Sequence, residues 1–208
     1  MFGLGKPKVL EEVESQYNGK LTVTDGYGDR YVSTGIWTQS GGVIKDVWRP
    51  VLKKIAKKDK SWLILGLAAG TAAQMISKKY RPTKIVGVEI DPEMIRIGKQ
   101  YFDLDKIPNL EIINKSAEHL PAGRHGLVLG PEHYDFVLVD MYQNDQLPNF
   151  VYSDKFLDKR MGNIVVFNHL FYSDEMKQNA EKLVTKLRKK YQDVRLMRVL
   201  TNLMIICQ

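Results

Sequence analysis

The chain has 208 residues, of which 44% are hydrophobic, and it carries 31 lysines and arginines against 24 acids. This composition predicts one folded domain with a sizeable core. Its single cysteine excludes an internal disulfide and a cysteine-cluster metal site. The apolar runs are shorter than the roughly 18 residues that a membrane span needs, so we expect no membrane contact. We also expect no secretory signal peptide and a cytoplasmic location.

The first 45 residues predict a small appendage in front of the main domain. Residues 8–17 are typical of a short helix. Residues 20–38 place alternating β-formers around the glycine-rich segment 25–28, which predicts a β-hairpin. Residues 39–42, Gln-Ser-Gly-Gly, predict a loop.

Residues 46–208 predict the main domain, which begins with a helix. Apolar residues recur there at helical spacing, at Val47, Trp48, Val51, Leu52 and Ile55. Pro50 limits how early this helix starts, because proline is tolerated in a first turn. The remaining helices are predicted at Thr71–Tyr80, at Asp91–Phe102 and from Ser173 to about Tyr191.

The strands of the main domain are predicted from short apolar segments. They fall at Trp62–Leu65, Lys84–Val88, Leu110–Ile113, Phe136–Val139, Asn163–Phe167, Val194–Val199 and Leu203–Ile206. The alternation of strands and helices favours an α/β fold. We expect a doubly wound, mostly parallel Rossmann-like sheet of the class I methyltransferase type, with a C-terminal antiparallel hairpin. Cys207, beside that hairpin's apolar residues, is expected to be a buried strand residue rather than a nucleophile.

A glycine-containing turn, residues 66–71, follows the first buried strand and opens a helix. Gly66, Ala68 and Gly70 allow a ligand to approach the backbone closely, and the helix start offers free N–H groups. Glu89 ends the next strand about twenty residues on, where an acid binds the ribose hydroxyls of an adenosine. Alternatively, the glycines serve only the tight packing of the turn, and Glu89 is an ordinary acid near a helix. The occurrence of both features at the expected spacing favours an adenosine-containing cofactor.

These segments carry a family resemblance. Residues 62–102, with Leu-Gly-Leu-Ala-Ala-Gly-Thr at 65–71 and Val-Glu-Ile-Asp-Pro-Glu-Met-Ile at 88–95, resemble the spermidine synthase-like branch of the class I S-adenosylmethionine-dependent methyltransferase superfamily. The resemblance runs from about Gln39 to the C-terminus and includes residues 134–140 and 147–157. It implies S-adenosylmethionine, or its decarboxylated form, as cofactor.

The resemblance also assigns site residues. Asp140 matches the acid that acts in spermidine synthases as a base towards the attacking amine. Glu89 matches the ribose-binding acid, Gln39 a cofactor-contacting glutamine, and Ser116 and Ala117 the pair that meets the adenine. The expected cofactor contacts are Gln39, Gly66, Ala68, Gly70, Glu89, Ile90, Ser116, Ala117 and Asp140. Asp140 is the expected catalytic residue, with a loop cap as the alternative role.

Three residues depart from the synthase pattern. Ala69 replaces an acid in the glycine turn, Trp48 replaces a tyrosine, and Gln143 replaces a second acid. A dicationic amine needs paired carboxylates when it is buried. We therefore expect methyl transfer to an unidentified acceptor, bound by Trp48, Tyr142 and Gln143. Aminopropyl transfer from decarboxylated S-adenosylmethionine and a non-catalytic nucleoside-binding module are the alternatives.

The remaining features leave several alternatives open. The loop at residues 141–152 is expected to form a lid or an acceptor wall. His169 is either a base on the acceptor side or a surface histidine. His119, His125 and His133 lack the spacing of metal ligands, so no metal is expected.

The main partner is expected to be a small molecule. A net charge of +7 also allows RNA, although a solvated lysine-rich face explains it too, and a homodimer is a further alternative.

Overall fold

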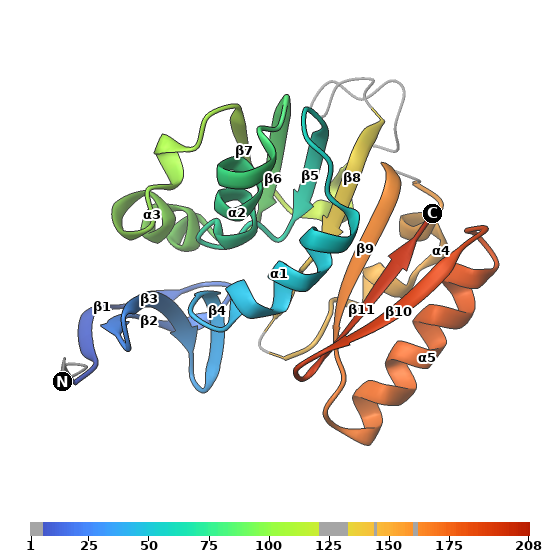
Figure 1. Ribbon diagram of the computed structural model, residues 1–208. Coiled ribbons are helices and arrows are strands. Elements are labelled where there is room, and N and C mark those ends of the chain that lie inside the picture. The colour runs from blue at the N-terminus through green and yellow to red at the C-terminus, as the bar shows by residue number, and fades with distance from the viewer. Residues whose placement is uncertain (1–5, 121–132, 144, 160–161) are drawn as a thin grey trace, which may run out of the picture.

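The computed structural model describes residues 6–120, 133–143, 145–159 and 162–208. A four-stranded antiparallel sheet, with the order β1-β2-β3-β4, precedes a seven-stranded sheet with the order β10-β11-β9-β8-β5-β6-β7 (Figure 1). The strands of the smaller sheet are β1 (Lys8–Ser15), β2 (Gly19–Gly26), β3 (Asp29–Thr34) and β4 (Trp37–Gly41). Those of the larger sheet are β5 (Ser61–Leu65), β6 (Lys84–Glu89), β7 (Leu110–Asn114), β8 (Tyr134–Val139), β9 (Gly162–Leu170), β10 (Val194–Val199) and β11 (Asn202–Cys207).

Helices connect these strands and cover both faces of the larger sheet. The α-helices are α1 (Ile44–Ile55), α2 (Thr71–Tyr80), α3 (Pro92–Tyr101), α4 (Asp154–Leu157) and α5 (Asp174–Arg188). Short 3₁₀ helices are η1 (Leu104–Lys106), η2 (Ala117–His119) and η3 (Asn149–Tyr152). Among the described helices, none has both the length and the apolar character needed to cross a membrane.

The larger sheet is parallel except at one side. β5 lies in the middle and pairs in parallel with β6 and β8, which pair in parallel with β7 and β9. β11 pairs antiparallel with β9 and with β10, so the chain closes as a hairpin. The expected mostly parallel sheet with a C-terminal antiparallel hairpin is therefore confirmed.

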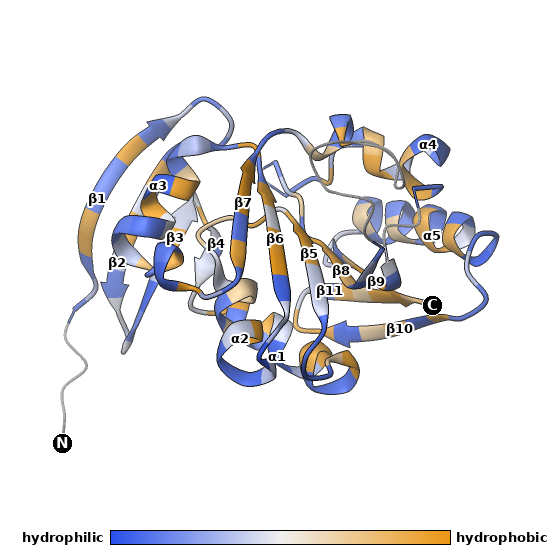
Figure 2. Ribbon diagram, turned by 90° about the horizontal axis from the view of Figure 1, so that it is seen from above, coloured by the Kyte–Doolittle hydropathy of each residue, from blue (hydrophilic) through white to orange (hydrophobic). Residues whose placement is uncertain are grey.

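Alternate residues of the central strands enter two different cores. Leu63 and Leu65 pack with residues of α4 and α5 on one face, whereas Trp62 and Ile64 pack with α1 and α2 on the other. Figure 2 shows apolar residues along these central strands. Both faces are apolar because helices cover both, which explains the continuous apolar runs in the sequence. Cys207 is buried in β11, as expected, and burial raises the pKa of its thiol to about 12.

Two secondary-structure predictions for the N-terminal region were wrong. Residues 8–15 form strand β1 rather than a helix, because they pair antiparallel with β2 from Lys8 to Ser15. Pairing with a neighbouring strand outweighs local helix preference there. The expected loop at 39–42 instead belongs largely to β4, which pairs with β3. Gly41 permits this close pairing, since a Cβ at its position would lie 2.0 Å from the carbonyl oxygen of Arg30.

Helix α1 also starts earlier than expected. It begins at Ile44, so Pro50 lies inside the helix and not in its first turn. Its buried face, which includes Val47, Trp48 and Val51, packs into the core with β10 and β11 and keeps the helix continuous across the proline. The predicted domain boundary after residue 45 therefore falls within this helix.

Candidate functional site

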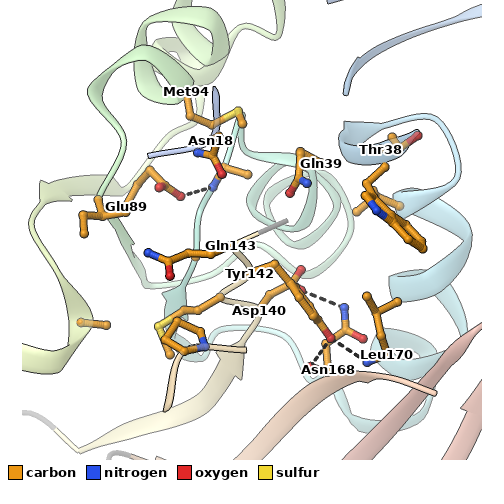
Figure 3. Close-up of a pocket in the computed structure, with 18 of the residues that line it drawn as sticks. Asn18, Thr38, Gln39, Glu89, Met94, Asp140, Tyr142, Gln143, Asn168 and Leu170 are labelled. Carbon is orange, nitrogen blue, oxygen red and sulfur yellow. Dashed lines mark hydrogen bonds between the residues drawn. The ribbon is translucent and has the colours of Figure 1, made fainter. Parts of the chain in front are cut away.

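A pocket of about 510 Å³ opens along the carboxyl ends of β6, β5, β8 and β9. In doubly wound sheets this end of the strands is where ligands bind. In Figure 3, Glu89 and Asn18 lie on one side of the pocket, Thr38 and Leu170 lie on the opposite side, and Asp140 lies between them.

The turn after β5 brings backbone from two neighbouring strands close together. The N–H groups of Gly66 and Leu67 donate to the carbonyl oxygen of Val88 at 2.9 and 3.0 Å. Gly66 has a φ of +86°, and a Cβ there would lie 2.1 Å from the carbonyl oxygen of Asp140. Glycine at position 66 is thus required for the chain after β8 to pass beside the turn.

Glu89 is fixed at the end of β6 by two backbone donors. Its Oε2 accepts from the N–H of Ala68 at 2.8 Å, and its Oε1 accepts from the N–H of Asp91 at 3.0 Å. Burial raises the pKa of this carboxyl above its ordinary value, and the two backbone bonds partly oppose that rise. The result is a buried acceptor group held in one orientation beside the glycine turn.

The N-terminal sheet is attached to the same region through Asp91, the N-cap of α3. Asp91 Oδ1 accepts from the N–H of Glu93, while Oδ2 accepts from Ser15 Oγ at 2.5 Å and from Asn18 Nδ2 at 2.6 Å. These bonds place Asn18 on the wall of the pocket next to Glu89. The smaller sheet therefore contributes to the site.

Asp140 follows β8 and is the half-buried carboxylate in the middle of the pocket. Its Oδ2 accepts from Trp48 Nε1 at 2.9 Å, and its Oδ1 accepts from Asn168 Nδ2 at 2.8 Å. Asn168 Oδ1 in turn accepts from Asn202 Nδ2 at 2.7 Å. Burial raises the pKa of Asp140, and the two donors partly oppose that rise. Two donors leave part of the carboxylate's accepting capacity available, since a carboxylate has about four lone-pair sites.

Tyr142 closes the pocket over the end of β9. Its hydroxyl donates to the carbonyl oxygen of Asn168 and accepts from the N–H of Leu170, both at 2.8 Å. Burial raises the pKa of this phenol well above its usual value. Gln143 follows it and also lines the pocket. The loop expected to form an acceptor wall thus supplies part of the lining, apart from residue 144, which lies outside the described residues.

The structure brings most of the predicted site residues together. Those that line the pocket are Gln39, Gly66, Ala68, Glu89, Ile90, Ser116, Ala117, Asp140, Tyr142 and Gln143. Two lie outside its lining. Gly70 packs against Leu104, whose Cδ1 would lie 2.4 Å from a Cβ at position 70. Trp48 is fully buried in the core and reaches the site only through its bond to Asp140.

Two other residues singled out from the sequence are turned away from the pocket. Ala69 lies outside the lining, because its side chain packs beneath the N-terminal sheet and its N–H donates to Ser40 Oγ at 3.0 Å. His169 is buried rather than exposed, and its Nε2 bonds to the Tyr152 hydroxyl at 2.8 Å, away from the pocket. His125 falls outside the described residues. Among the residues described, no cluster of acids, histidines and cysteines could hold a metal ion.

Several lining residues were not predicted from the sequence. They include Asn18, Trp37, Val47, Lys115 and Asn202. The position of Asn202 could have been noticed in the sequence, because an asparagine at the start of an apolar strand is unusual and needs a hydrogen-bond partner when buried. The others are ordinary in sequence and reach the pocket only through the packing of the N-terminal sheet and α1.

Acids outnumber bases in the described part of the lining, opposite to the +7 charge of the whole chain. The acids are Glu89, Glu118 and Asp140, and the base is Lys115, at the end of β7. Glu89 and Asp140 end strands that lie on either side of β5, so strand spacing separates them by about 10 Å. The charged residues of the described lining therefore favour a cationic ligand.

No family model matches the chain. A polyamine aminopropyltransferase from Prochlorococcus marinus is 30% identical over 165 residues, which cover 74% of this chain and 56% of that protein. A probable spermidine synthase from Corynebacterium glutamicum has a similar structure, with a TM-score of 0.74, 16% identity and coverage of 97% of this chain and 80% of that one. A spermidine synthase in complex with the transition-state analogue AdoDATO gives a TM-score of 0.66 and 12% identity, with coverage of 96% and 72%.

The curated relatives correct the expected reaction. They are named polyamine aminopropyltransferases, so the preference for methyl over aminopropyl transfer was wrong. This chain spans between 26% and 56% of the length of those relatives. The comparisons give no support to an RNA partner or to a homodimer, which the sequence left open as alternatives. Together with the sheet order, the similar structures show that this chain has a spermidine synthase-like fold of the class I methyltransferase type.

Proposed function

We propose that this chain transfers an aminopropyl group from decarboxylated S-adenosylmethionine to the nitrogen of an amine. The observation that carries the proposal is the position of Asp140, a half-buried carboxylate in the middle of an acid-rich pocket. Its accepting capacity is only partly used, and it follows β8, the strand next to β5, at the end of the sheet where ligands bind. The aminopropyltransferase names of the curated relatives support the same reaction.

The cofactor fits along the strand ends from β7 to β8. Glu89 accepts hydrogen bonds from the ribose hydroxyls, and the backbone at Gly66 and Ala68 lies against the sugar and the sulfur. Ile90, Ser116 and Ala117 enclose the adenine, while Gln39 faces the tail of the cofactor. These assignments use residues that line one continuous pocket.

Charge favours the decarboxylated form of the cofactor. Its tail carries an ammonium group and no carboxylate, whereas S-adenosylmethionine carries both. The described lining offers one cation, Lys115, which precedes Ser116 at the adenine end. A tail carboxylate near Asp140 and Gln39 would therefore meet a carboxylate instead of a cation, which is unfavourable in a buried site.

The chemistry requires the acceptor nitrogen, the carbon and the sulfur to lie in line. Asp140 removes a proton from the acceptor ammonium, and the free nitrogen attacks the carbon bonded to the sulfonium. The carbon–sulfur bond breaks and its electron pair returns to sulfur, which leaves as a neutral thioether. Burial raises the pKa of Asp140, which makes it a better base than an exposed aspartate, and Trp48 and Asn168 hold its orientation.

The test is the release of 5′-methylthioadenosine from decarboxylated S-adenosylmethionine in the presence of an amine. We expect turnover with this cofactor and none with S-adenosylmethionine. Asp140→Asn should lower kcat by about 10²- to 10⁴-fold, the usual contribution of a general base. The control is Asp158→Asn, an exposed aspartate that pairs with Lys190, and it should leave kcat unchanged. Absence of turnover with every amine, or equal effects of the two variants, would contradict the proposal.

A further inference from the structure

We infer that the acceptor has a single cationic amine on an apolar body, and is not a diamine. This inference rests on the proposed function and names its substrate class. It comes from the end of the pocket beyond Asp140, on the side away from Glu89, where the acceptor must lie if the cofactor occupies the strand ends from β7 to β8.

Apolar side chains dominate this acceptor end. They come from β4, from the end of β9, from the β10–β11 turn and from the start of α1 with the residue before it. These residues are Trp37, Val43, Ile44, Val47, Leu170 and Leu200. Trp37 is fixed there by stacking on Tyr172, just past β9, with ring centroids 5.3 Å apart. Such a surface favours methylene, methyl or aromatic groups.

Asp140 is the single carboxylate at this end among the described lining residues. Glu89 lies at the end of β6 and Glu118 in η2, both on the cofactor side of the pocket. Asp145, the next acid along the chain, lies outside the lining, and its Oδ2 accepts from the Tyr172 hydroxyl at 2.9 Å. One ammonium can therefore pair with Asp140, and a second has no carboxylate partner in the lining.

Three neutral polar side chains at this end, those of Tyr142, Asn168 and Thr201, already have partners. The Tyr142 hydroxyl bonds to the backbone on either side of His169, and the Asn168 amide joins Asp140 to Asn202. The Thr201 hydroxyl donates to Asn202 Oδ1 at 3.2 Å. A second ammonium would lose its hydration without gaining an anionic partner, which is strongly unfavourable. A methyl group in its place would lose nothing.

The experiment compares two acceptors of equal size, 1,4-diaminobutane and pentylamine, with decarboxylated S-adenosylmethionine. We expect kcat/KM to be at least about tenfold higher for pentylamine, because its methyl group enters the apolar end without losing hydration. Assays are run at the same pH for both acceptors, and product is measured as 5′-methylthioadenosine. A higher kcat/KM for the diamine would overturn this inference and leave the proposed function standing. Absence of product with both amines would instead reject the proposed function.

A charge variant tests the same inference from the protein side. Thr201 is an exposed turn residue that lines the acceptor end, so Thr201→Asp adds an acid there at a position where aspartate is well tolerated. We expect the ratio of kcat/KM for diamine over monoamine to rise about tenfold. Thr83→Asp is the matched control, because Thr83 is an exposed threonine next to the start of β6, at the opposite end of the strands. An unchanged ratio in Thr201→Asp, or an equal rise in both variants, would contradict the inference.

Discussion

The indole Nε1 of Trp48 donates a hydrogen bond to Oδ2 of Asp140 at 2.9 Å, joining the start of α1 to the end of β8. Trp48 is fully buried, so its ring contacts the core rather than the pocket. Trp48 therefore contributes to the site through its hydrogen bond to this carboxylate. It stabilises the charged form of Asp140, as does Asn168.

Trp48→Phe should shift the pH dependence of the reaction. Removing the Nε1 donor removes an interaction that lowers the pKa of Asp140, so this already raised pKa should rise further. The base is active when deprotonated, and the acidic limb of kcat/KM should therefore move to higher pH. At neutral pH we expect kcat/KM to fall about tenfold.

Trp62→Phe provides the control for that measurement. Trp62 is also fully buried, but its Nε1 has no hydrogen-bond partner and its ring stacks on Phe136. Its replacement should lower stability without moving the pH profile. If both tryptophan variants shift the profile equally, the bond to Asp140 is not the cause.

Glu89→Gln should weaken binding of decarboxylated S-adenosylmethionine by about 10- to 100-fold, because hydrogen bonds to a charged acceptor are stronger than those to a neutral one. Isothermal titration calorimetry measures this effect. Glu111→Gln, on the exposed side of β7, changes the same charge outside the pocket and should leave Kd unchanged. Equal losses in both variants would reject the role of Glu89.

The affinity for the cofactor should also depend on pH through Glu89. Burial raises the pKa of this carboxyl above 4.5, and protonation removes its accepting charge. Binding by the wild-type chain should therefore weaken as pH falls through that raised pKa, starting at a higher pH than for an exposed glutamate. The Glu89→Gln variant should lack this dependence, so parallel curves for the two proteins would contradict the assignment.

The chain of hydrogen bonds from Asn202 through Asn168 to Asp140 predicts a split between stability and activity. Asn202→Ala leaves Asn168 Oδ1 buried without its donor, which should lower the free energy of unfolding by about 1–3 kcal/mol in urea titrations. Asn168→Ala removes the donor to Asp140 as well, so it should lower kcat more. A larger loss of kcat in Asn202→Ala would contradict this order.

Gly66→Ala should disturb both the fold and the site. The new Cβ would meet the Asp140 carbonyl oxygen at 2.1 Å, and a φ of +86° strains any residue with a Cβ. We expect a loss in unfolding free energy of more than about 2 kcal/mol, together with loss of turnover. Gly28→Ala separates the two causes, because Gly28 has a φ of +79° with nothing near its Cβ position. Equal losses in both variants would show that strain alone, without the contact, is responsible.

Much of the α/β domain could be predicted from the sequence. The apolar runs at residues 62–65 and 136–139 specify strands buried on both faces, and Asp91-Pro92-Glu93 specifies a helix start. The N-terminal region could not be predicted in the same way. The amphipathic pattern of residues 8–15 fits a helix or a strand, and pairing with β2 decides between them.

The directions in which the side chains around Asp140 point could not be predicted from the sequence, for a related reason. The sequence led us to expect Trp48 at the acceptor, yet the packing of α1 turns its ring into the core. Ala69 is also turned away from the pocket, because the N-terminal sheet packs over it. Both outcomes depend on contacts between segments far apart in the chain.

By itself, the sequence determined the parallel sheet, the glycine turn and the acids at the ends of β6 and β8, because strand periodicity and turn geometry depend on neighbouring residues. Only the tertiary structure decided that Asn202, Asn168 and Trp48 converge on Asp140, and that the acceptor end of the pocket has one carboxylate and apolar walls. The physical reason is that convergence is set by strand order and by how the N-terminal sheet and α1 pack. Local sequence patterns do not encode either of these.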